Sequence, residues 1–206
     1  MENLNFDNAT VLYQNNYLGE EESVNIFNTI SNIFEKEFAN EIDINVKVIK
    51  LSRKTLVYID KNIDKAIIPK IWGKNVKILE FTSDLINVRE RLEKDLNFKF
   101  NICLANYYDT GKNTIGFHSD NEEKGSTSCI ASLSIGAERK ISFRKKNIKN
   151  IKDIYKEINL PSRNLLVMAD GTQENYQHSI MADKECKSPR LNLTFRLFDN
   201  ERYLSV

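Results

Sequence analysis

The N-terminal half of the chain contains two stretches in which apolar positions recur every three or four residues, the spacing of one face of an α-helix. In the first stretch, over 20–39, the recurring positions are Val24, Phe27, Ile30, Phe34 and Phe38. The glutamates at 20–22 suit the start of a helix, because acidic side chains interact favourably with the positive end of the helix dipole. The pattern predicts an amphipathic helix over 20–39.

The second helical pattern runs over 84–96, with Leu85, Val88, Leu92 and Leu96 on one side. Thr82 or Ser83 could cap its start, because a hydroxyl oxygen accepts a hydrogen bond from a free backbone N–H there. Between the two helices, the segment INVKVIKLSRKTLVYID over 44–60 alternates apolar and basic residues and predicts one or two strands.

After Asn97 the pattern changes to short β-rich runs separated by Gly, Asn and Asp. The runs cover 100–108, 113–119, 126–136, 139–146, 163–170, 174–180 and 189–198. Several short strands with turn residues between them and few helices favour a β-sandwich or jelly roll. We place one boundary, near residue 97, between the mixed N-terminal part and the β-rich part.

Three of these runs present polar side chains on a single face, because residues i and i+2 of a strand point to the same side. His118 and Asp120 share a side, and so do Asn106 and Tyr108. In the last run, one side carries Arg190, Asn192, Thr194 and Arg196, while the other carries Leu191, Leu193, Phe195 and Leu197. The alternation predicts a polar surface where a sandwich would ordinarily bury apolar residues.

Composition narrows the class of protein. A chain of 206 residues that is 41% hydrophobic can bury one core. The 30 basic and 29 acidic residues nearly cancel, so a nucleic-acid partner is neither indicated nor excluded and would need a local basic surface.

Cysteine usage and the absence of export signals indicate an intracellular protein of the cytoplasm or nucleus. The three cysteines are Cys103, Cys129 and Cys186, an odd number without CxxC spacing, which fits reduced thiols. The first residues lack a secretory signal pattern, and no stretch approaches the roughly 18 apolar residues of a membrane span. We therefore expect no secretion and no membrane partner.

The chain has only two histidines, His118 and His178, and both lie in the β-rich part. Two imidazoles and one carboxylate, here Asp120, can hold Fe(II) on one triangular face and leave positions open for a bidentate cosubstrate and O2. Zinc could use the same ligands, although the HExxH pattern of zinc hydrolases is absent. A single His-x-Asp also arises by chance on protein surfaces. The second histidine and the arginines that follow it favour the metal site.

Arg190 and Arg196 lie six residues apart, roughly 20 Å along a strand. A guanidinium within a strand face needs an anionic partner, and a dicarboxylate such as 2-oxoglutarate offers one carboxylate at each end. The alternative is that one or both are surface cations on an edge strand. Asn192 and Thr194 on the same face make that alternative weaker.

Six motifs together resemble the AlkB-like family of Fe(II)- and 2-oxoglutarate-dependent dioxygenases, especially its nucleic-acid repair branches. They are NYY, GFHSDNE, SLSIGAERKISFR, NLLVMADG, NYQHSI and PRLNLTFR. The resemblance is strong from Asn101 to Phe198 and thinner before it. It implies an α+β fold, with a double-stranded β-helix (jelly-roll) core over 97–206 and an N-terminal α/β lid for nucleotide recognition over 1–96, together forming one compact catalytic unit.

The resemblance also implies roles for individual residues. His118, Asp120 and His178 would hold Fe(II). The 2-oxoglutarate site would be lined by Asn106, Tyr108, Arg190, Asn192, Thr194 and Arg196. Arg190 with Tyr108 would bind the distal carboxylate, and Arg196 with the asparagines would lie near the keto-acid end.

Residues for the substrate are implied in two places. Asn121 and Glu122 follow the HxD motif where family members contact the flipped base, although Glu122 is equally compatible with a solvated acid. The segment SRKTLVYID nominates Arg53, Tyr58 and Asp60, but this match is short and an ordinary strand explains it nearly as well. The chain also departs from the family at 162–164, where many relatives have a glycine, and at Tyr176, where tryptophan is common. Neither departure touches a metal ligand.

The function implied is oxidative demethylation of N-alkylated bases in DNA, of the 1-methyladenine or 3-methylcytosine type, with Fe(II), 2-oxoglutarate and O2, releasing formaldehyde, succinate and CO2. A base in a duplex must first leave the stack, and Glu122 and Tyr58 would receive it. The alternatives are the same chemistry on RNA or protein methyl groups, or an inactive nucleic-acid-binding relative. We expect a monomer whose partner is alkylated DNA or RNA.

Two basic runs are candidates for phosphate contacts. The first contains Lys47, Lys50, Arg53 and Lys54, and the second contains Arg139, Lys140, Arg144, Lys145, Lys146 and Lys149. Either run could instead be a solvated face, and the second could be no more than a basic hairpin.

Overall fold

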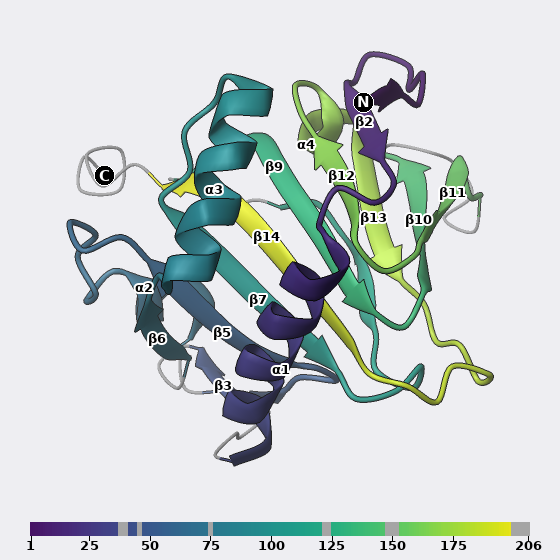
Figure 1. The fold of residues 1–206 in the computed structure, drawn as a ribbon. Helices are drawn as coiled ribbons and strands as arrows, with labels where there is room; N and C mark the ends of the chain where they lie inside the picture. The colour runs from purple at the N-terminus through teal and green to yellow at the C-terminus, as the bar shows by residue number, and fades with distance from the viewer. Residues whose placement is uncertain (37–40, 45–46, 74–75, 121–124, 147–152, 199–206) are drawn as a thin grey trace.

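The computed structural model describes residues 1–36, 41–44, 47–73, 76–120, 125–146 and 153–198. Within them, an eight-stranded sheet and a four-stranded sheet form the body of the protein (Figure 1). The large sheet has the order β1 (Glu2–Asn3), β2 (Val11–Gln14), β12 (Asn164–Met168), β9 (Gly125–Gly136), β14 (Arg190–Phe198), β7 (Ile102–Tyr108), β5 (Lys54–Ile59) and β6 (Lys77–Glu80). Its strands pair antiparallel except for the parallel pair β5 and β6.

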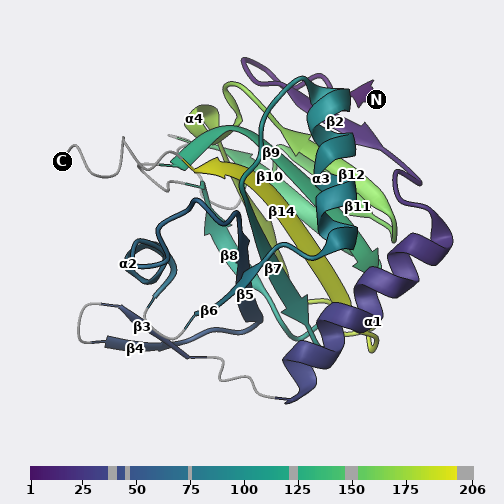
Figure 2. The same cartoon turned by 60° about the vertical axis from the view of Figure 1, so that its left-hand side comes forward.

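The small sheet has the order β11 (Lys156–Leu160), β10 (Arg139–Lys145), β13 (Tyr176–Ile180) and β8 (Ile115–His118). A core cluster that includes Ile130 and Leu166 of the large sheet and Phe143 and Ile180 of the small one lies between the two sheets. A separate two-stranded hairpin, β3 (Glu41–Ile44) with β4 (Lys47–Lys50), lies near the short helix α2 (Ile68–Trp72) (Figure 2).

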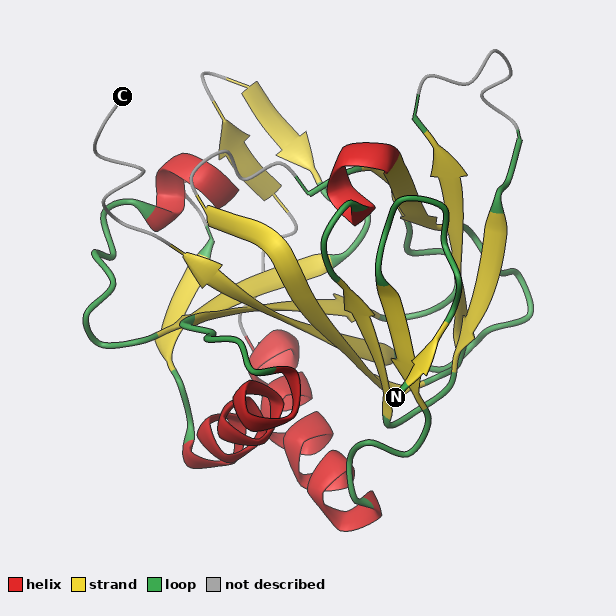
Figure 3. Cartoon of the chain, turned by 90° about the horizontal axis from the view of Figure 1, so that it is seen from above, coloured by secondary structure: helices red, strands yellow, loops and turns green. Residues whose placement is uncertain are grey.

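Helices α1 (Glu20–Lys36) and α3 (Ser83–Leu96) lie together on the outer face of the large sheet, opposite the small sheet (Figure 3). α3 begins where the sequence predicts, because the Thr82 hydroxyl accepts a hydrogen bond from the backbone N–H of Leu85 at 3.4 Å. It ends at Asn97, whose left-handed conformation (φ 49°) stops the helix.

The buried face of α1 differs from the predicted one. Ile26, Ile30 and Phe34 are buried in the main core, whereas Val24 is 51% exposed. Phe27 is only partly buried, and Phe38 lies outside the described residues. The helix is therefore rotated relative to the predicted face: Ile26, four residues before Ile30, lies on the buried side, whereas Val24, six residues before Ile30, does not.

Strand β14 follows the predicted alternation. Leu191, Leu193 and Phe195 are buried beneath α1 and α3. The polar row of Arg190, Asn192, Thr194 and Arg196 points the other way, toward the small sheet, and lines a cavity there. The segment over 44–60, for which the sequence predicts one or two strands, contains two strands, β4 and β5, which belong to different sheets.

Residues before 97 form part of the large sheet. β2 pairs with β12, β5 pairs with β7, and β6 continues that edge. The boundary predicted near residue 97 is therefore not a boundary in the sheet. Strands β1, β2, β3, β6 and β11 and the short helices α2 and α4 (Thr172–Asn175) are not anticipated by the sequence patterns.

Two smaller expectations can be compared with the structure. Cys103, Cys129 and Cys186 are free thiols. In the part of the chain that the structure describes, no helix has the length and apolar character required to cross a bilayer.

Candidate metal and cosubstrate site

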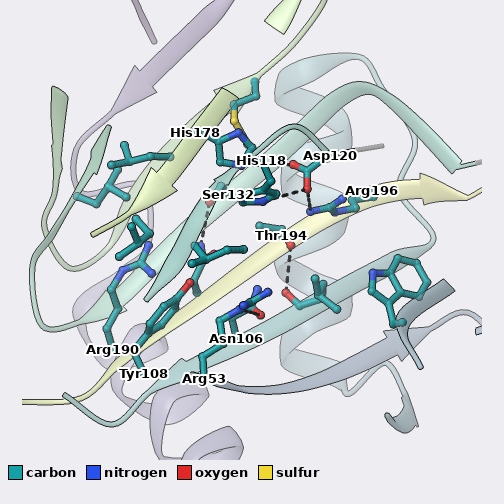
Figure 4. A pocket seen from close by; sticks show the side chains of 18 residues that line it. Arg53, Asn106, Tyr108, His118, Asp120, Ser132, His178, Arg190, Thr194 and Arg196 are labelled. Carbon is teal, nitrogen blue, oxygen red and sulfur yellow. Dashed lines mark hydrogen bonds and ion pairs between the residues drawn. The ribbon is translucent and has the colours of Figure 1, made fainter. Parts of the chain in front are cut away.

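Three side chains from two neighbouring strands and the turn after one of them meet at one point. His118, at the end of β8, is directly opposite His178 of β13 in the antiparallel register, and their ring centroids are 4.4 Å apart. Asp120 follows β8 by two residues. One ligand atom from each of the three lies within 4.8 Å of the other two (Figure 4).

The orientation of these side chains fits a metal ion. His118 Nδ1 is 2.9 Å from the Gly116 carbonyl, which can only accept, so the proton lies on Nδ1 and Nε2 carries the lone pair. His118 Nε2 is 3.8 Å from Asp120 Oδ1, and His178 Nε2 is 3.6 Å from Asp120 Oδ2. Asp120 Oδ2 is buried without a hydrogen-bond partner among the described residues. Two imidazole nitrogens and one carboxylate oxygen are the donor set that suits Fe(II).

Charge states at neutral pH also suit coordination. Burial alone would raise the pKa of Asp120. The positive charge of Arg196 and the two histidines outweigh this effect and lower the pKa to about 2, below its ordinary value. Burial lowers the pKa of His178 to about 4, although Asp120 acts in the opposite direction. Asp120 is therefore ionised and His178 neutral, the forms in which each coordinates a metal.

A cavity of about 170 Å³ lies between the two sheets beside these ligands, with room for several waters or a small acid. It brings together all six side chains expected at the cosubstrate site, namely Asn106, Tyr108, Arg190, Asn192, Thr194 and Arg196. Their role in binding 2-oxoglutarate remains a prediction. Apolar side chains close much of the remaining wall, among them Leu104, Ile115, Ile141 and Ile180.

Arg190, at one end of the polar row, is a buried cation that is 1% exposed. Its Nη2 donates to Ser134 Oγ at 2.9 Å, and its Cζ is 5.2 Å from the centre of the Tyr108 ring. Nε and Nη1 have no hydrogen-bond partner among the described residues, and burial lowers the pKa of this guanidinium. Because a buried cation is stabilised by an anion with matching acceptors, this end of the cavity suits a carboxylate.

The amide of Asn106 has a defined orientation. Its Oδ1 accepts hydrogen bonds from Arg53 Nε at 2.8 Å and Thr55 Oγ1 at 2.9 Å, which leaves the Nδ2 group as a donor. Asn192 is oriented in the opposite sense, because its Nδ2 donates to Ser132 Oγ and to the Leu133 carbonyl, both at 2.9 Å. The two asparagines can therefore offer one donor and one acceptor to a ligand in the cavity.

The residues nominated for the substrate fall in different places. Arg53 lines the cavity. Tyr58 is 0% exposed and packs in the main core beneath the helices, so the expectation that it receives a base is wrong in this structure. Asp60 forms an ion pair with Arg89 of α3 and does not line the cavity. Asn121 and Glu122 lie outside the described residues.

The reason for the error at Tyr58 is the direction of β5. Tyr58 is opposite Cys103 in the register, on the face that α1 and α3 cover, whereas Thr55 is opposite Asn106 on the cavity face. Neighbouring residues of a strand point to opposite faces, and the sequence does not reveal which face the helices cover.

Most described members of the second basic run have partners within the chain. Arg139 is buried and donates to the carbonyls of Thr110, Gly111, Asn113 and Met181, so a phosphate role for it is excluded in this structure. Lys140 pairs with Glu157, Lys145 pairs with Asp7, Lys146 donates to the Gln173 carbonyl, and Arg144 covers the Phe117 ring.

In the first basic run, Lys54 pairs with Asp109 at 2.8 Å. The side chains of Lys47 and Lys50, like Lys149 of the second run, lie outside the described residues.

Among the cavity residues that the sequence analysis did not nominate are Trp72 and Ser132. Trp72, the one tryptophan of the chain, reaches the cavity wall from α2, and Ser132 reaches it from β9. The presence of only one tryptophan in the chain could have marked Trp72 as a candidate site residue. However, α2 has five residues, too few for a helical pattern to be recognised.

Comparison with other sequences gives a family match over most of the chain. The profile described as the 2OG-Fe(II) oxygenase superfamily matches residues 10–196. The alpha-ketoglutarate-dependent dioxygenase alkB homolog 3 of Mus musculus is 36% identical over 118 residues, covering 54% of this chain and 41% of that protein. The DNA oxidative demethylase ALKBH2 of Bos taurus is 35% identical over 133 residues, covering 62% of this chain and 45% of that protein. The matched region spans less than half the length of either relative.

Solved structures share the fold at low sequence identity. The structure of OsALKBH1 superposes with a TM-score of 0.65 and 15% identity, covering 94% of this chain and 99% of that one. A prolyl hydroxylase from Trichoplax adhaerens, in complex with a hypoxia inducible factor peptide, gives a TM-score of 0.57 and 16% identity, covering 95% and 87%. These likenesses confirm the predicted jelly-roll core.

Proposed function

Because this chain belongs to the 2OG-Fe(II) oxygenase superfamily, we propose that it oxidatively removes N-alkyl groups from bases in DNA, of the 1-methyladenine or 3-methylcytosine type. The observation that carries the proposal is the meeting of His118, Asp120 and His178 beside a cavity that ends in the buried cation Arg190. The choice of DNA is supported by the similarity to a relative named as a DNA oxidative demethylase.

Fe(II), held by His118, Asp120 and His178, would supply the oxidation: O2 and 2-oxoglutarate are consumed, CO2 and succinate leave, and the N-methyl group is hydroxylated. The resulting N-hydroxymethyl group then breaks its C–N bond and leaves as formaldehyde, and the ring nitrogen recovers its unmodified state. Each turnover thus releases one succinate, one CO2 and one formaldehyde.

The chain itself binds and orients 2-oxoglutarate and excludes bulk water from the site. Arg190 binds the distal carboxylate of 2-oxoglutarate with two unused donor atoms, and Tyr108 packs against its guanidinium. Asn106 offers its Nδ2 donor to the keto-acid end, while Arg196 holds one oxygen of Asp120. The apolar wall around the cavity keeps bulk water from the reacting atoms.

The substrate base would approach past Trp72, which lines the cavity from α2, and Arg53, which lines it from the position directly before β5. An aromatic ring offers a stacking surface for an unstacked base, and a guanidinium can contact the phosphate or the base edge. In this proposal Trp72 takes the role first expected of Tyr58. Of the segment before 97, the part around Arg53 and Trp72 acts as the lid, and the protein works as a monomer inside the cell.

The proposal is tested by incubating the protein with Fe(II), 2-oxoglutarate and ascorbate and with oligonucleotides that carry 1-methyladenine. Single-stranded DNA, duplex DNA and RNA of the same sequence are compared, and succinate, formaldehyde and the mass of each oligonucleotide are measured. Removal of the methyl group from DNA with matching formaldehyde supports the proposal, and His178→Ala is the inactive control.

Other outcomes of this experiment would indicate a different substrate or an inactive protein. Faster turnover of RNA would assign the same chemistry to RNA. Succinate release that no oligonucleotide stimulates would direct the search to protein methyl groups. Binding of nucleic acid without any succinate release would indicate a binding protein with an inactive site.

A further inference from the structure

A buried glutamine outside the ligand set contacts the backbone of the metal ligand Asp120. Gln173 lies on α4, immediately before the strand that carries His178, and is 5% exposed. Its Oε1 accepts a hydrogen bond from the backbone N–H of Asp120 at 2.9 Å. This contact joins two segments that lie 53 residues apart in the sequence.

The rest of Gln173 is fixed in a way that determines its amide orientation. Nε2 lies 3.7 Å from Met168 Sδ, a sulfur that can only accept, so Nε2 belongs on that side and Oε1 faces Asp120. The backbone carbonyl of Gln173 accepts a hydrogen bond from Lys146 Nζ at 2.6 Å. The glutamine is therefore held at three places and has little freedom to follow a moving Asp120.

Asp120 depends on such a contact because it lies beyond the end of a strand. The pairing of β8 with β13 fixes His118 opposite His178, but β8 ends at His118. Among the described residues, two hydrogen bonds tie the following segment to α4 and β13: one from Ser119 Oγ to the Tyr176 carbonyl at 2.7 Å and one from Asp120 N to Gln173 Oε1. The Asp120 carboxylate itself also accepts a hydrogen bond from Arg196 of β14 at 3.0 Å.

We infer that Gln173 is a positioning residue of the metal centre, which holds the Asp120 carboxylate in place by accepting a hydrogen bond from its backbone N–H. The sheet positions the two histidines, Arg196 engages one carboxylate oxygen of Asp120, and Gln173 positions the backbone that carries this third ligand. Loss of partners that orient a metal ligand typically weakens metal binding by roughly ten- to a hundredfold. This inference rests on the proposed metal centre and is independent of the substrate.

The test compares three variants of the full chain with the parent. Gln173→Met removes the acceptor at nearly constant length. Gln173→Glu keeps an acceptor oxygen at the same place, and burial favours its neutral form. Glu174→Ala changes an exposed neighbour on the same helix and serves as the matched control. Metal-free protein is titrated anaerobically with Mn(II), and free Mn(II) is followed by electron paramagnetic resonance. Thermal unfolding without metal is recorded in parallel.

We expect Gln173→Met to raise the dissociation constant for Mn(II) by roughly ten- to a hundredfold. Gln173→Glu should recover most of the affinity, and Glu174→Ala should match the parent. If Gln173→Met does not fold, Gln173→Asn takes its place with the same expectation, because it withdraws the amide by one methylene.

Two results would overturn the inference in distinguishable ways. A purely structural role predicts that Gln173→Met, or Gln173→Asn in its place, lowers the unfolding temperature while Mn(II) binds as tightly as in the parent. That result would contradict the positioning role of Gln173 and leave the proposed function intact. A parent protein that binds no Mn(II) removes the metal centre itself, and with it the proposed function.

Discussion

Arg196 of β14 donates a hydrogen bond from Nη2 to Asp120 Oδ1 at 3.0 Å, and both side chains are buried. The bond joins the polar row of the large sheet to the ligand set of the small sheet. The two carboxylate oxygens therefore have different roles, because Oδ1 accepts the hydrogen bond from Arg196 and Oδ2 is left to coordinate the metal.

Replacement of Arg196 by Met should destabilise the metal-free protein, because it leaves the Asp120 carboxylate buried without its cation. Breaking a buried pair from one side costs about 3–5 kcal/mol. Urea unfolding of the metal-free protein measures the change. The double variant with Asp120→Asn should recover part of the loss, since the uncompensated charge is then absent. Additive effects of the two substitutions would contradict the pairing.

Replacement of His178 by Ala should abolish metal binding, since it removes one of three ligands. We expect Mn(II) affinity to fall by more than about a hundredfold, the upper range for partners that only orient a ligand. His118→Ala should behave alike. Titration by electron paramagnetic resonance measures both. A His178→Ala protein that still binds Mn(II) and releases succinate would show that the ligand set is wrong.

Replacement of Arg190 by Met should weaken binding of 2-oxoglutarate without destabilising the empty protein. Hydrogen bonds to charged groups contribute about 1.5–3 kcal/mol, so the dissociation constant should rise roughly ten- to a hundredfold. The substitution also removes a buried cation that has no anionic partner among the described residues, so the free energy of unfolding without ligand should stay level or rise. Calorimetric titration of Mn(II)-loaded protein measures the first effect, and urea unfolding measures the second. Unchanged affinity for 2-oxoglutarate would place its distal carboxylate elsewhere.

Replacement of Trp72 by Ala should weaken binding of the alkylated oligonucleotide by about 1–3 kcal/mol, the contribution of stacking one base on an aromatic ring. Trp72→Phe should retain much of the affinity. The matched control is Tyr58→Phe, because Tyr58 is buried on the opposite face and its hydroxyl has no partner among the described residues. Fluorescence anisotropy with a labelled oligonucleotide measures all three. A loss with Tyr58→Phe that equals the loss with Trp72→Ala would reverse the assignment.

Acidification should destabilise the metal-free protein through His178. Burial lowers the pKa of this imidazole from 6.5 to about 4 in the folded state. Between these values the unfolded chain binds a proton that the folded chain does not. The contribution to stability is therefore present above 6.5 and is lost as pH falls toward 4, at up to ~1.4 kcal/mol per pH unit.

Urea unfolding across this pH window measures that slope. His178→Gln, which cannot titrate, should have a shallower slope than the parent. Equal slopes would mean that His178 is not the group responsible.

Sequence periodicity alone determined which side chains share a strand face. The alternation along β14 correctly separated Arg190 and Arg196 from Leu191 and Leu193, because successive residues of any strand point to opposite sides. The same local rule placed Asn106 with Tyr108. The chain has only two histidines, so any site with two imidazole ligands had to use both His118 and His178.

Tertiary structure decided which face is covered and which segments meet. Only the pairing of β8 with β13 brings His118 beside His178, and only the packing of α1 and α3 on the large sheet buries Tyr58. Trp72 and Gln173 reach the site from helices too short to have a recognisable period. Periodicity is a property of neighbouring residues, whereas burial and contact depend on segments distant in the chain, and so the sequence supplied the chemical groups and the packing of the sheets supplied their geometry.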